Sequence, residues 1–136
     1  MKAGEIIRLF RRKKKMKTDD IAALFGVTTA AVRHWENGYR QISDEHYASI
    51  ADLLDITIAA LHDHHLDTPD DIMQILFDLD RIGVISVDGD LLRINATWAK
   101  NAIQLWREKK QQLADGEITL DDYTYWEYSF KVSNNE

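Results

Sequence analysis

Residues 18–40, TDDIAALFGVTTAAVRHWENGYR, constrain the fold of this chain more than any other stretch. We expect Thr18 to cap the start of a helix. The two aspartates after it suit the first turn, since acidic side chains there interact favourably with the helix dipole. Gly26 can adopt a left-handed conformation at low cost, so it predicts a sharp turn between two short helices. We expect the second helix to be capped by Thr28 and to end near Asn37.

The second of these helices separates into two faces when each residue is placed about 100° further round the axis than the one before. Five residues share an arc of roughly 140°, and they are Thr29, Ala30, Arg33, His34 and Asn37. The opposite side carries Ala31, Val32 and Trp35, which suit burial. A helix that packs on a protein body and also enters the DNA major groove needs this division. The stretch therefore predicts a helix-turn-helix.

The spacing of these residues resembles the lambda-repressor and Cro-like helix-turn-helix family, also called the XRE family. The resemblance is carried by Ile21-Ala22, Gly26-Val27, Val32 and the run Trp35-Glu36-Asn37-Gly38. It implies a five-helix DNA-binding domain over residues 1–61 and a role in transcriptional regulation. It also implies that Arg11 and Glu36 form a structural ion pair, which ties the first helix to the recognition helix.

The exposed arc of the second helix supplies the candidate base contacts, which are Thr29, Ala30, Arg33 and His34. Arg33 can pair bidentately with a guanine, and His34 can donate to a base or a phosphate. The short side chains of Thr29 and Ala30 can pack on a thymine methyl group. Candidate phosphate contacts, which position the protein without reading sequence, are Lys17, Thr18, Thr28, Tyr39 and Arg40.

The net charge of −6 is unusual for a DNA-binding protein, but the charge is unevenly distributed along the chain. Residues 1–66 hold ten Lys+Arg and nine Asp+Glu, whereas residues 67–136 hold seven and fourteen. Before residue 18, eight lysines and arginines stand against the single Glu5. The local charge near the phosphates sets counterion release, rather than the charge of the whole chain. We therefore expect double-stranded DNA to contact the N-terminal domain only.

Length and composition exclude several other classes of protein. A chain of 136 residues with 45% apolar composition suits one ordinary domain or two small ones. The absence of cysteine excludes disulfides and thiolate zinc sites. No apolar run approaches the roughly 18 residues of a membrane span, so we expect a cytoplasmic protein without a membrane partner. There is no nucleophile–base pairing and no phosphate-binding glycine loop, so we predict no enzyme activity.

The segment LHDHHLD, residues 61–67, concentrates three of the five histidines. Its His62, His64 and His65 could in principle ligate zinc or nickel together with the neighbouring aspartates. Their spacing matches no helical HxxxH arrangement, so we interpret residues 62–68 as a polar linker and predict no metal and no other cofactor. We interpret His46 as an exposed helical residue, and we expect Ile58 to face inward from the short helix that closes the N-terminal domain.

The second half of the chain begins with Thr68-Pro69, a cap followed by proline at the first helical position. An apolar repeat at i, i+3, i+4 and i+7 then predicts an amphipathic helix ending near Gly83, carried by Ile72, Ile75, Leu76 and Leu79. Around Asp88-Gly89 we expect a hairpin of two strands. Its residues Ile85, Val87, Leu92 and Ile94 would share one apolar face.

Two further helices complete the predicted C-terminal domain, residues 69–136. The first runs from about Ala96 to Ala114 with Asn95 as its cap. The second follows a capping box at Thr119–Asp122 and carries an apolar stripe of Leu120, Tyr123, Trp126 and Phe130. The predicted fold class is mainly α, with a five-helix lambda-repressor-like domain followed by a small α+β domain of one helix, a β-hairpin and two helices.

The C-terminal domain has an unusual density of aromatic residues, namely Trp98, Trp106, Tyr123, Tyr125, Trp126, Tyr128 and Phe130. Such residues more often build a core or a subunit interface than line a ligand pocket, although both interpretations stay open. A winged helix is rejected, because the acidic hairpin tip Asp88-Gly89-Asp90 would repel phosphates. The tail from Trp106 to Phe130 resembles tails of bacterial regulators of this family from low-GC Gram-positive organisms.

Two functions fit these patterns. The preferred one is a sequence-specific transcriptional regulator, a repressor that binds an inverted-repeat operator as a homodimer. Its C-terminal domain would dimerise or respond to a small-molecule or protein effector. The alternative is an antitoxin-like or phage-type interaction module whose C-terminal domain binds a partner protein.

Overall fold

The computed structural model describes residues 2–62, 64 and 66–134. The chain divides into two compact units. The first comprises Met1–Asp63 with Thr124–Phe130, and the second comprises His64–Tyr123 with Lys131–Glu136. The sequence pattern places Thr124–Phe130 in the C-terminal domain, whereas the structure groups this segment with the N-terminal unit. Within the described part of the chain, no helix is long and apolar enough to cross a membrane.

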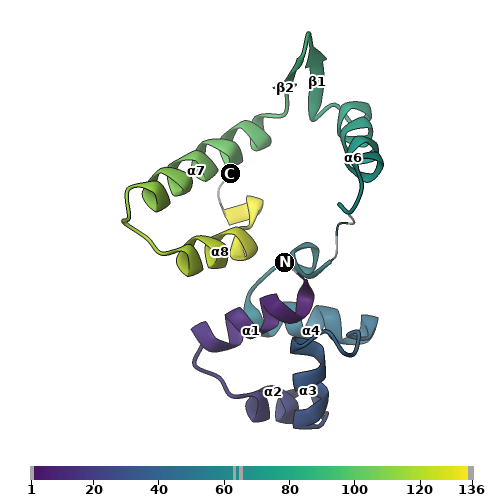
Figure 1. Ribbon diagram of the computed structural model, residues 1–136, viewed down its shortest axis with the longest axis vertical. Coiled ribbons are helices and arrows are strands. Elements are labelled where there is room, and N and C mark those ends of the chain that lie inside the picture. Colours follow the sequence, from purple (N-terminus) through teal and green to yellow (C-terminus); the bar gives the residue numbers. More distant parts are fainter. Residues whose placement is uncertain (1, 63, 65, 135–136) are drawn as a thin grey trace. The chain divides into compact units, whose positions relative to one another are not determined.

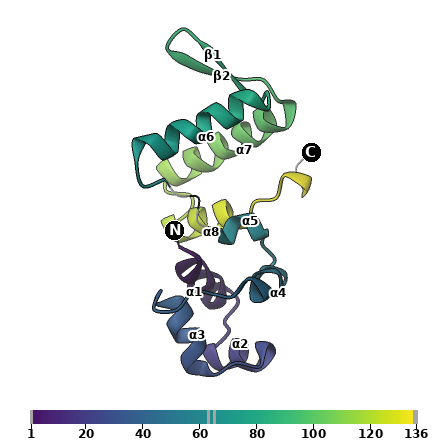
Figure 2. The ribbon, with the colours of Figure 1, turned by 90° about the vertical axis from the view of Figure 1, so that its right-hand side faces the viewer.

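The first unit contains the predicted five helices (Figures 1 and 2). They are α1 (Ala3–Lys13), α2 (Thr18–Phe25), α3 (Thr29–Glu36), α4 (Asp44–Leu54) and α5 (Ile58–Leu61). Their shared core contains one side of α1, since Ile6, Ile7 and Phe10 are at most 1% exposed. The mainly helical fold class is confirmed, and buried residues of α1, α2 and α3 belong to one core.

The local signals around α2 and α3 are mostly confirmed. Gly26 has a φ of 63°, the left-handed conformation that the turn requires. The Thr28 hydroxyl accepts a hydrogen bond from the Ala31 N–H at 3.1 Å, which caps α3. Thr18 is not the cap of α2, however, because it is already helical and Lys17 occupies the cap position. There the Lys17 N–H donates to the Asp20 carboxylate at 2.7 Å, which replaces the expected threonine cap.

Two expectations for the outer helices of this unit are wrong. Ile58, expected to face inward, is 44% exposed, and Ile56 just before α5 is buried instead. His46, expected to be exposed, is half-buried between aromatic rings, 5.4 Å from Trp35 and 6.1 Å from Phe25. Its Nδ1 also lies 2.8 Å from the Ser43 hydroxyl, so ring packing and a hydrogen bond hold the imidazole inward.

The second unit contains α6 (Pro69–Arg81), the strands β1 (Ile85–Asp88) and β2 (Leu91–Ile94), and α7 (Thr97–Ala114). Helix α8 (Leu120–Ser129) spans the division between the units, and a short 3₁₀ helix follows at Val132–Asn134. The predicted cap at Thr68 and the predicted capping box at Thr119–Asp122 are confirmed. The Thr68 hydroxyl accepts from the Asp71 N–H, and the Thr119 hydroxyl accepts from the Asp122 N–H, each at 3.1 Å.

The strands β1 and β2 pair antiparallel, with Ile85 opposite Ile94 and Val87 opposite Leu92. The predicted apolar face of the hairpin is therefore confirmed. The two loop residues are Gly89 and Asp90, one position later than expected, and Gly89 adopts the required positive φ of 64°. Asn95 does not cap α7, because its N–H extends the pairing by donating to the Val84 carbonyl at 2.9 Å. Ala96 takes the cap position instead.

Candidate nucleic-acid interface

Helix α3 has one buried face and one exposed face, as the helical arithmetic predicted. Ala31, Val32 and Trp35 are at most 8% exposed and pack into the first unit. Four members of the polar arc are exposed and Thr29 is half-buried, and the exposed four are Ala30, Arg33, His34 and Asn37. Figure 1 shows α3 beside α2 at one end of this unit. The exposure of these four side chains shows that the described residues leave this face of α3 uncovered.

Arg33 is the long cationic side chain at the centre of this face. Among the described residues its guanidinium has neither a hydrogen-bond partner nor an ion-pair partner. A planar fork of donors that is free in this way matches the two acceptors on the major-groove edge of a guanine. The position and chemistry of Arg33 therefore suit a base contact.

Thr29 forms a contact that the sequence did not predict. Its hydroxyl donates to the Asp19 carboxylate at 2.6 Å, which joins the start of α3 to the first turn of α2. Because the Thr29 hydroxyl proton is donated to Asp19, it is not available for a hydrogen bond to a base. The methyl group of Thr29 is then the part of the side chain that remains for an apolar contact with a base.

The chain turns sharply after α3, which brings Tyr39 next to His34. Gly38 has a φ of 74°, and the Tyr39 N–H donates to the His34 carbonyl at 2.9 Å. The two rings meet edge to face, with centroids 6.3 Å apart. Tyr39 is 82% exposed and Arg40 is exposed beside it, so both candidate phosphate residues lie open at the end of α3.

The other candidate phosphate residues lie at helix N-termini. Lys17 is exposed and Thr18 is half-buried at the start of α2, and Thr28 is exposed at the start of α3. Helix N-termini carry partial positive charge and free N–H groups, both of which favour a phosphate oxygen. The nine predicted DNA residues therefore lie on α2, on α3 and on the residues directly before and after these helices.

Arg11 and Glu36 form the ion pair that the family resemblance implied. The Nε and Nη2 atoms of Arg11 donate to the two carboxylate oxygens of Glu36 at 2.5 and 3.1 Å. Glu36 is only 5% exposed, so the carboxylate depends on this pairing. The hydrogen bond to Glu36 raises the pKa of the Arg11 guanidinium, which outweighs the opposing effect of burial.

Arg8 adds a second connection between α1 and the end of α3, which the sequence did not reveal. It donates to the Glu36 carbonyl at 3.3 Å and to the Asn37 side-chain carbonyl. Its Nε also lies 3.5 Å from the Glu36 carboxylate. The spacing of Arg8 and Arg11, three residues apart on one helix, is a signal that could have indicated a shared partner.

Gly4 allows α1 and α3 to approach this closely. A Cβ atom at this position would lie 2.1 Å from the Trp35 carbonyl oxygen and 3.0 Å from the Glu36 carbonyl oxygen. Real Cβ atoms do not approach backbone so closely, so only glycine fits without movement of a helix. The signal in the sequence was a glycine inside a helical pattern, which usually has a packing reason.

The segment from α8 in the first unit packs on α1. The Tyr125 ring stacks on Phe10 with centroids 4.5 Å apart, and the Lys13 ammonium lies 5.8 Å from the same ring. Tyr128 also packs against the core of this unit. Burial raises the pKa of the Tyr128 hydroxyl, and the negative charges of Glu127 and Glu5 raise it further. Two of the seven C-terminal aromatics therefore serve the core of the first unit.

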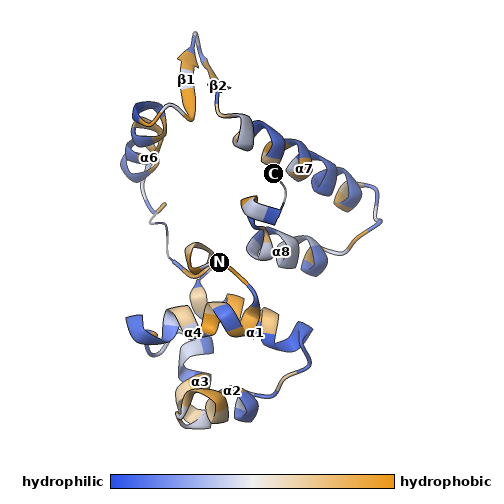
Figure 3. Ribbon diagram, turned by 180° about the vertical axis from the view of Figure 1, so that it is seen from behind, coloured by the Kyte–Doolittle hydropathy of each residue, from blue (hydrophilic) through white to orange (hydrophobic). Residues whose placement is uncertain are grey.

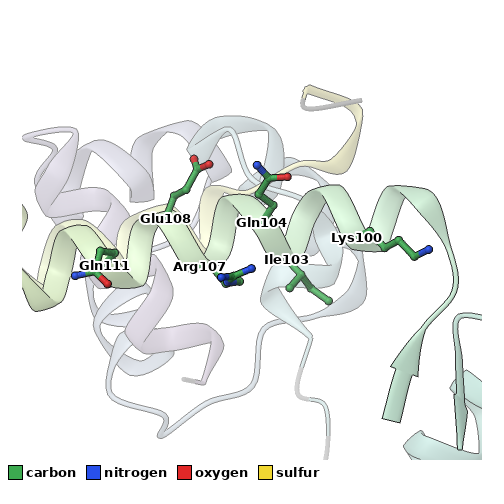
Figure 4. A pocket seen from close by; sticks show the side chains of 6 residues that line it. All are labelled: Lys100, Ile103, Gln104, Arg107, Glu108 and Gln111. Carbon is green, nitrogen blue, oxygen red and sulfur yellow. The ribbon is translucent and has the colours of Figure 1, made fainter. Parts of the chain in front are cut away.

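A groove runs along one side of α7 in the second unit (Figure 4). It has a volume of about 540 Å³ and is lined by Lys100, Ile103, Gln104, Arg107, Glu108 and Gln111. The side chains in this lining are mostly polar and none is aromatic. The groove therefore does not correspond to the aromatic ligand pocket that the sequence left open.

Residues 61–67 show no ligand cluster as far as the structure describes them. Among the described residues, no group of three or more His, Asp or Glu side chains could hold a metal ion. His62 stacks on Tyr47 with ring centroids 5.3 Å apart. The remaining candidate ligands Asp63 and His65 lie outside the described residues.

Comparison with known proteins agrees with this geometry. The model of the helix-turn-helix family matches residues 7–61, which span α3 and most of the first unit. A search of curated proteins found no match, and a search of solved structures found none either. Residues 7–61 are a helix-turn-helix domain of the lambda-repressor and Cro-like, XRE type. The chain therefore carries the DNA-binding domain of a transcription regulator.

Proposed function

We propose that the protein is a sequence-specific transcriptional repressor that binds an inverted-repeat operator as a homodimer. Each α3 enters a major groove, and the two half-sites lie about one helical turn apart. The observation that carries this proposal is the exposed arc of α3, with an unpartnered Arg33 opposite a face that is buried and tied to α1. A repressor acts by occupying DNA, which requires only binding and no partner protein.

Within this function the side chains divide into two roles. Thr29, Ala30, Arg33 and His34 approach the base edges, because they lie on the exposed part of α3. Phosphate oxygens are bound by residues at the helix ends and in the following turn, namely Lys17, Thr18, Thr28, Tyr39 and Arg40. The first group gives sequence preference, and the second group gives affinity and register.

The experiment is selection of bound fragments from random DNA, followed by titration of two variants across salt concentrations. Arg33→Ala is expected to lose discrimination at particular base pairs by about 1 to 3 kcal/mol. Arg40→Ala is expected to weaken binding to all sequences similarly and to flatten the salt dependence. Equal losses on selected and random DNA for both variants would contradict these roles. A palindromic consensus would support the homodimer, and a reporter gene under the selected site would test repression.

A second function is favoured by one observation, which is the exposed apolar surface of the second unit. Such a surface suits an antitoxin-like or phage-type module that binds a partner protein. Co-purification with the product of a neighbouring gene would favour this function. A monodisperse homodimer that binds DNA by itself would count against it.

A further inference from the structure

The second unit has very little core within one copy of the chain. Of its described residues, only Ile85, Ala99 and Tyr123 are buried apolar residues. Ordering each residue costs about 1–2 kcal/mol of conformational entropy, and burial of apolar surface must offset this cost. Three buried residues cannot offset it for a unit of this length. The unit therefore needs a further surface against which its apolar side chains can pack.

The uncovered side chains lie mainly on α6 and α7. On α6 no residue is buried, and Ile72, Met73, Ile75 and Phe77 are 37–49% exposed. Their positions give α6 an apolar arc of roughly 200°. On α7 the exposed apolar residues are Trp98 at 46% and Trp106 at 45%. Figure 3 shows apolar and polar residues alternating along the ribbons of both helices.

The two helices carry opposite charges. Helix α6 contains four aspartates and one arginine, a formal charge of −3. Helix α7 contains four lysines and arginines and one glutamate, a formal charge of +3. Pairing α6 with α7 therefore brings unlike charges together, whereas pairing two copies of α6 would bring eight aspartates together.

Some of these charges lie within the apolar arcs. Asp80 follows Leu79 and falls between Leu76 and Met73 around the α6 axis. Among the described residues its carboxylate has no hydrogen-bond or ion-pair partner. On α7, Lys110 falls beside the apolar stripe, with its ammonium 5.6 Å from the Trp106 ring. Opposite charges are thus placed where two apolar helix faces would meet.

We propose that a second copy of this chain covers these faces, with α6 of each protomer packed on α7 of its partner. Figures 1 and 2 show α6 and α7 of one copy joined through the hairpin. No residue of α6 is buried, so its apolar side chains remain available to a partner helix. A two-fold axis repeats the α6–α7 contact twice, which gives a closed dimer. This proposal rests on the proposed function, because it assigns the homodimer of the repressor to a surface.

The test uses two variants of the full chain that reverse the charges. Asp78→Lys/Asp80→Lys changes the charge of α6 from −3 to +1, and Lys109→Glu/Lys110→Glu changes that of α7 from +3 to −1. Lysines near the C-terminal end of α6 suit its helix dipole, so the first variant should keep the helix. Glu45→Lys/Asp52→Lys is the matched control for the α6 variant. It also replaces two acidic residues by lysine, but in α4 of the first unit.

Sedimentation of the full-length wild type is expected to show a dimer. Each charge-reversed variant should dissociate with a Kd at least about tenfold higher, since favourable pairs become repulsive at both copies of the contact. The control should sediment as the wild type does. An equimolar mixture of the two variants should dimerise again, because α6 of one variant then meets α7 of the other with unlike charges on both sides of the axis.

The mixture distinguishes a partner from closure within one chain. If α6 packed on its own α7, mixing the two variants would restore neither dimerisation nor helix stability. A single chain with all four substitutions would then regain helix stability and would stay monomeric. That result would overturn the proposal. Dimers of unchanged Kd in both variants would also overturn it, while leaving the repressor homodimer intact. A monomeric wild type would contradict the homodimer itself, and the Arg33 titration on DNA would still test base reading independently.

Discussion

Arg11 and Glu36 form a bidentate ion pair between α1 and the last turn of the recognition helix, with N–O distances of 2.5 and 3.1 Å. Glu36 is 5% exposed and the Arg11 side chain 14% exposed, so little solvent screens the pair. The same carboxylate lies within 3.5 Å of Arg8. The exposed face of α3 is therefore oriented by charges buried on the opposite side of the helix.

Removing one partner of this pair should destabilise the first unit strongly. Arg11→Ala leaves the Glu36 carboxylate buried with only the peripheral Arg8, and loss of one buried partner costs about 3 kcal/mol. Urea unfolding at fixed protein concentration, followed by far-ultraviolet circular dichroism, measures the change. The control is Arg81→Ala, which removes the exposed pair with Asp78 and should cost less than about 1 kcal/mol. Equal losses in the two variants would contradict the burial of Glu36.

Gly4→Ala changes the free energy of unfolding in opposite directions through helix propensity and through packing, so the sign of the change shows which effect is larger. Alanine in place of a helical glycine normally stabilises by about 0.4–1 kcal/mol. At Gly4 the new Cβ would lie 2.1 Å from the Trp35 carbonyl oxygen, and we expect a loss of about 1–3 kcal/mol instead. The free energy of unfolding measures the outcome. Ala23→Gly, on the exposed side of α2, should show the ordinary propensity cost of about 1 kcal/mol. A Gly4→Ala variant more stable than the wild type would show that α1 and α3 are not this close.

Features set by neighbouring residues could be predicted from the sequence. The cap at Thr28, the left-handed Gly26 and the hairpin pairing of Val87 with Leu92 depend on side chains a few positions apart. Periodicity likewise identified the buried side of α3, because helical geometry alone decides which residues share a face. The predicted caps at Thr18 and Asn95 were each wrong by one residue. The Lys17 N–H bonds to the Asp20 carboxylate and starts α2 earlier, whereas the Asn95 N–H extends the hairpin pairing and α7 starts later.

Features set by the approach of distant segments could not be predicted. The contact of Arg8 with the end of α3 spans 28 residues, and the need for Gly4 arises only from the distance between two helices. The stacking of Tyr125 on Phe10 depends on α8 returning to α1, and no periodicity within α8 indicates its partner. Among the candidate DNA residues, the hydrogen bond from Thr29 to Asp19 belongs to the same class, because it depends on the angle between α2 and α3.

Tyr125→Ala should destabilise the first unit, although the residue lies far from α1 in the sequence. The change removes the stacked ring on Phe10 and a cation–π contact with Lys13. For a half-buried aromatic pair we expect a loss of about 1–2 kcal/mol. Hydrogen exchange of the α1 amides should report faster opening. Leu120→Ala in the same helix is the control, because Leu120 is 66% exposed and its loss should leave α1 exchange unchanged.

Tyr128 should ionise at higher pH than a free tyrosine, because burial raises its pKa and the charges of Glu127 and Glu5 add to this effect. The folded state therefore favours the neutral phenol. This contribution to stability is fully present below about pH 10, the pKa in the unfolded chain, and is lost as pH rises through the folded pKa. Absorbance at 295 nm should lose a late-titrating component in Tyr128→Phe. Glu5→Gln should move that component to lower pH, and a component unmoved by Glu5→Gln would contradict the contact with α1.

The last prediction concerns how Thr29 reads a base, given that its hydroxyl donates to Asp19 at 2.6 Å. If only the methyl group faces DNA, Thr29→Val should keep the preference for thymine, and Thr29→Ser should weaken it by about 0.8 kcal/mol, the value of one buried methyl group. Binding of each variant to a selected site, with thymine or uracil at the contacted position, measures this directly. Uracil lacks the methyl group, so the wild type should lose affinity on uracil while Thr29→Ser should not. A preference lost in Thr29→Val but kept in Thr29→Ser would show that the hydroxyl, and not the methyl group, contacts the base.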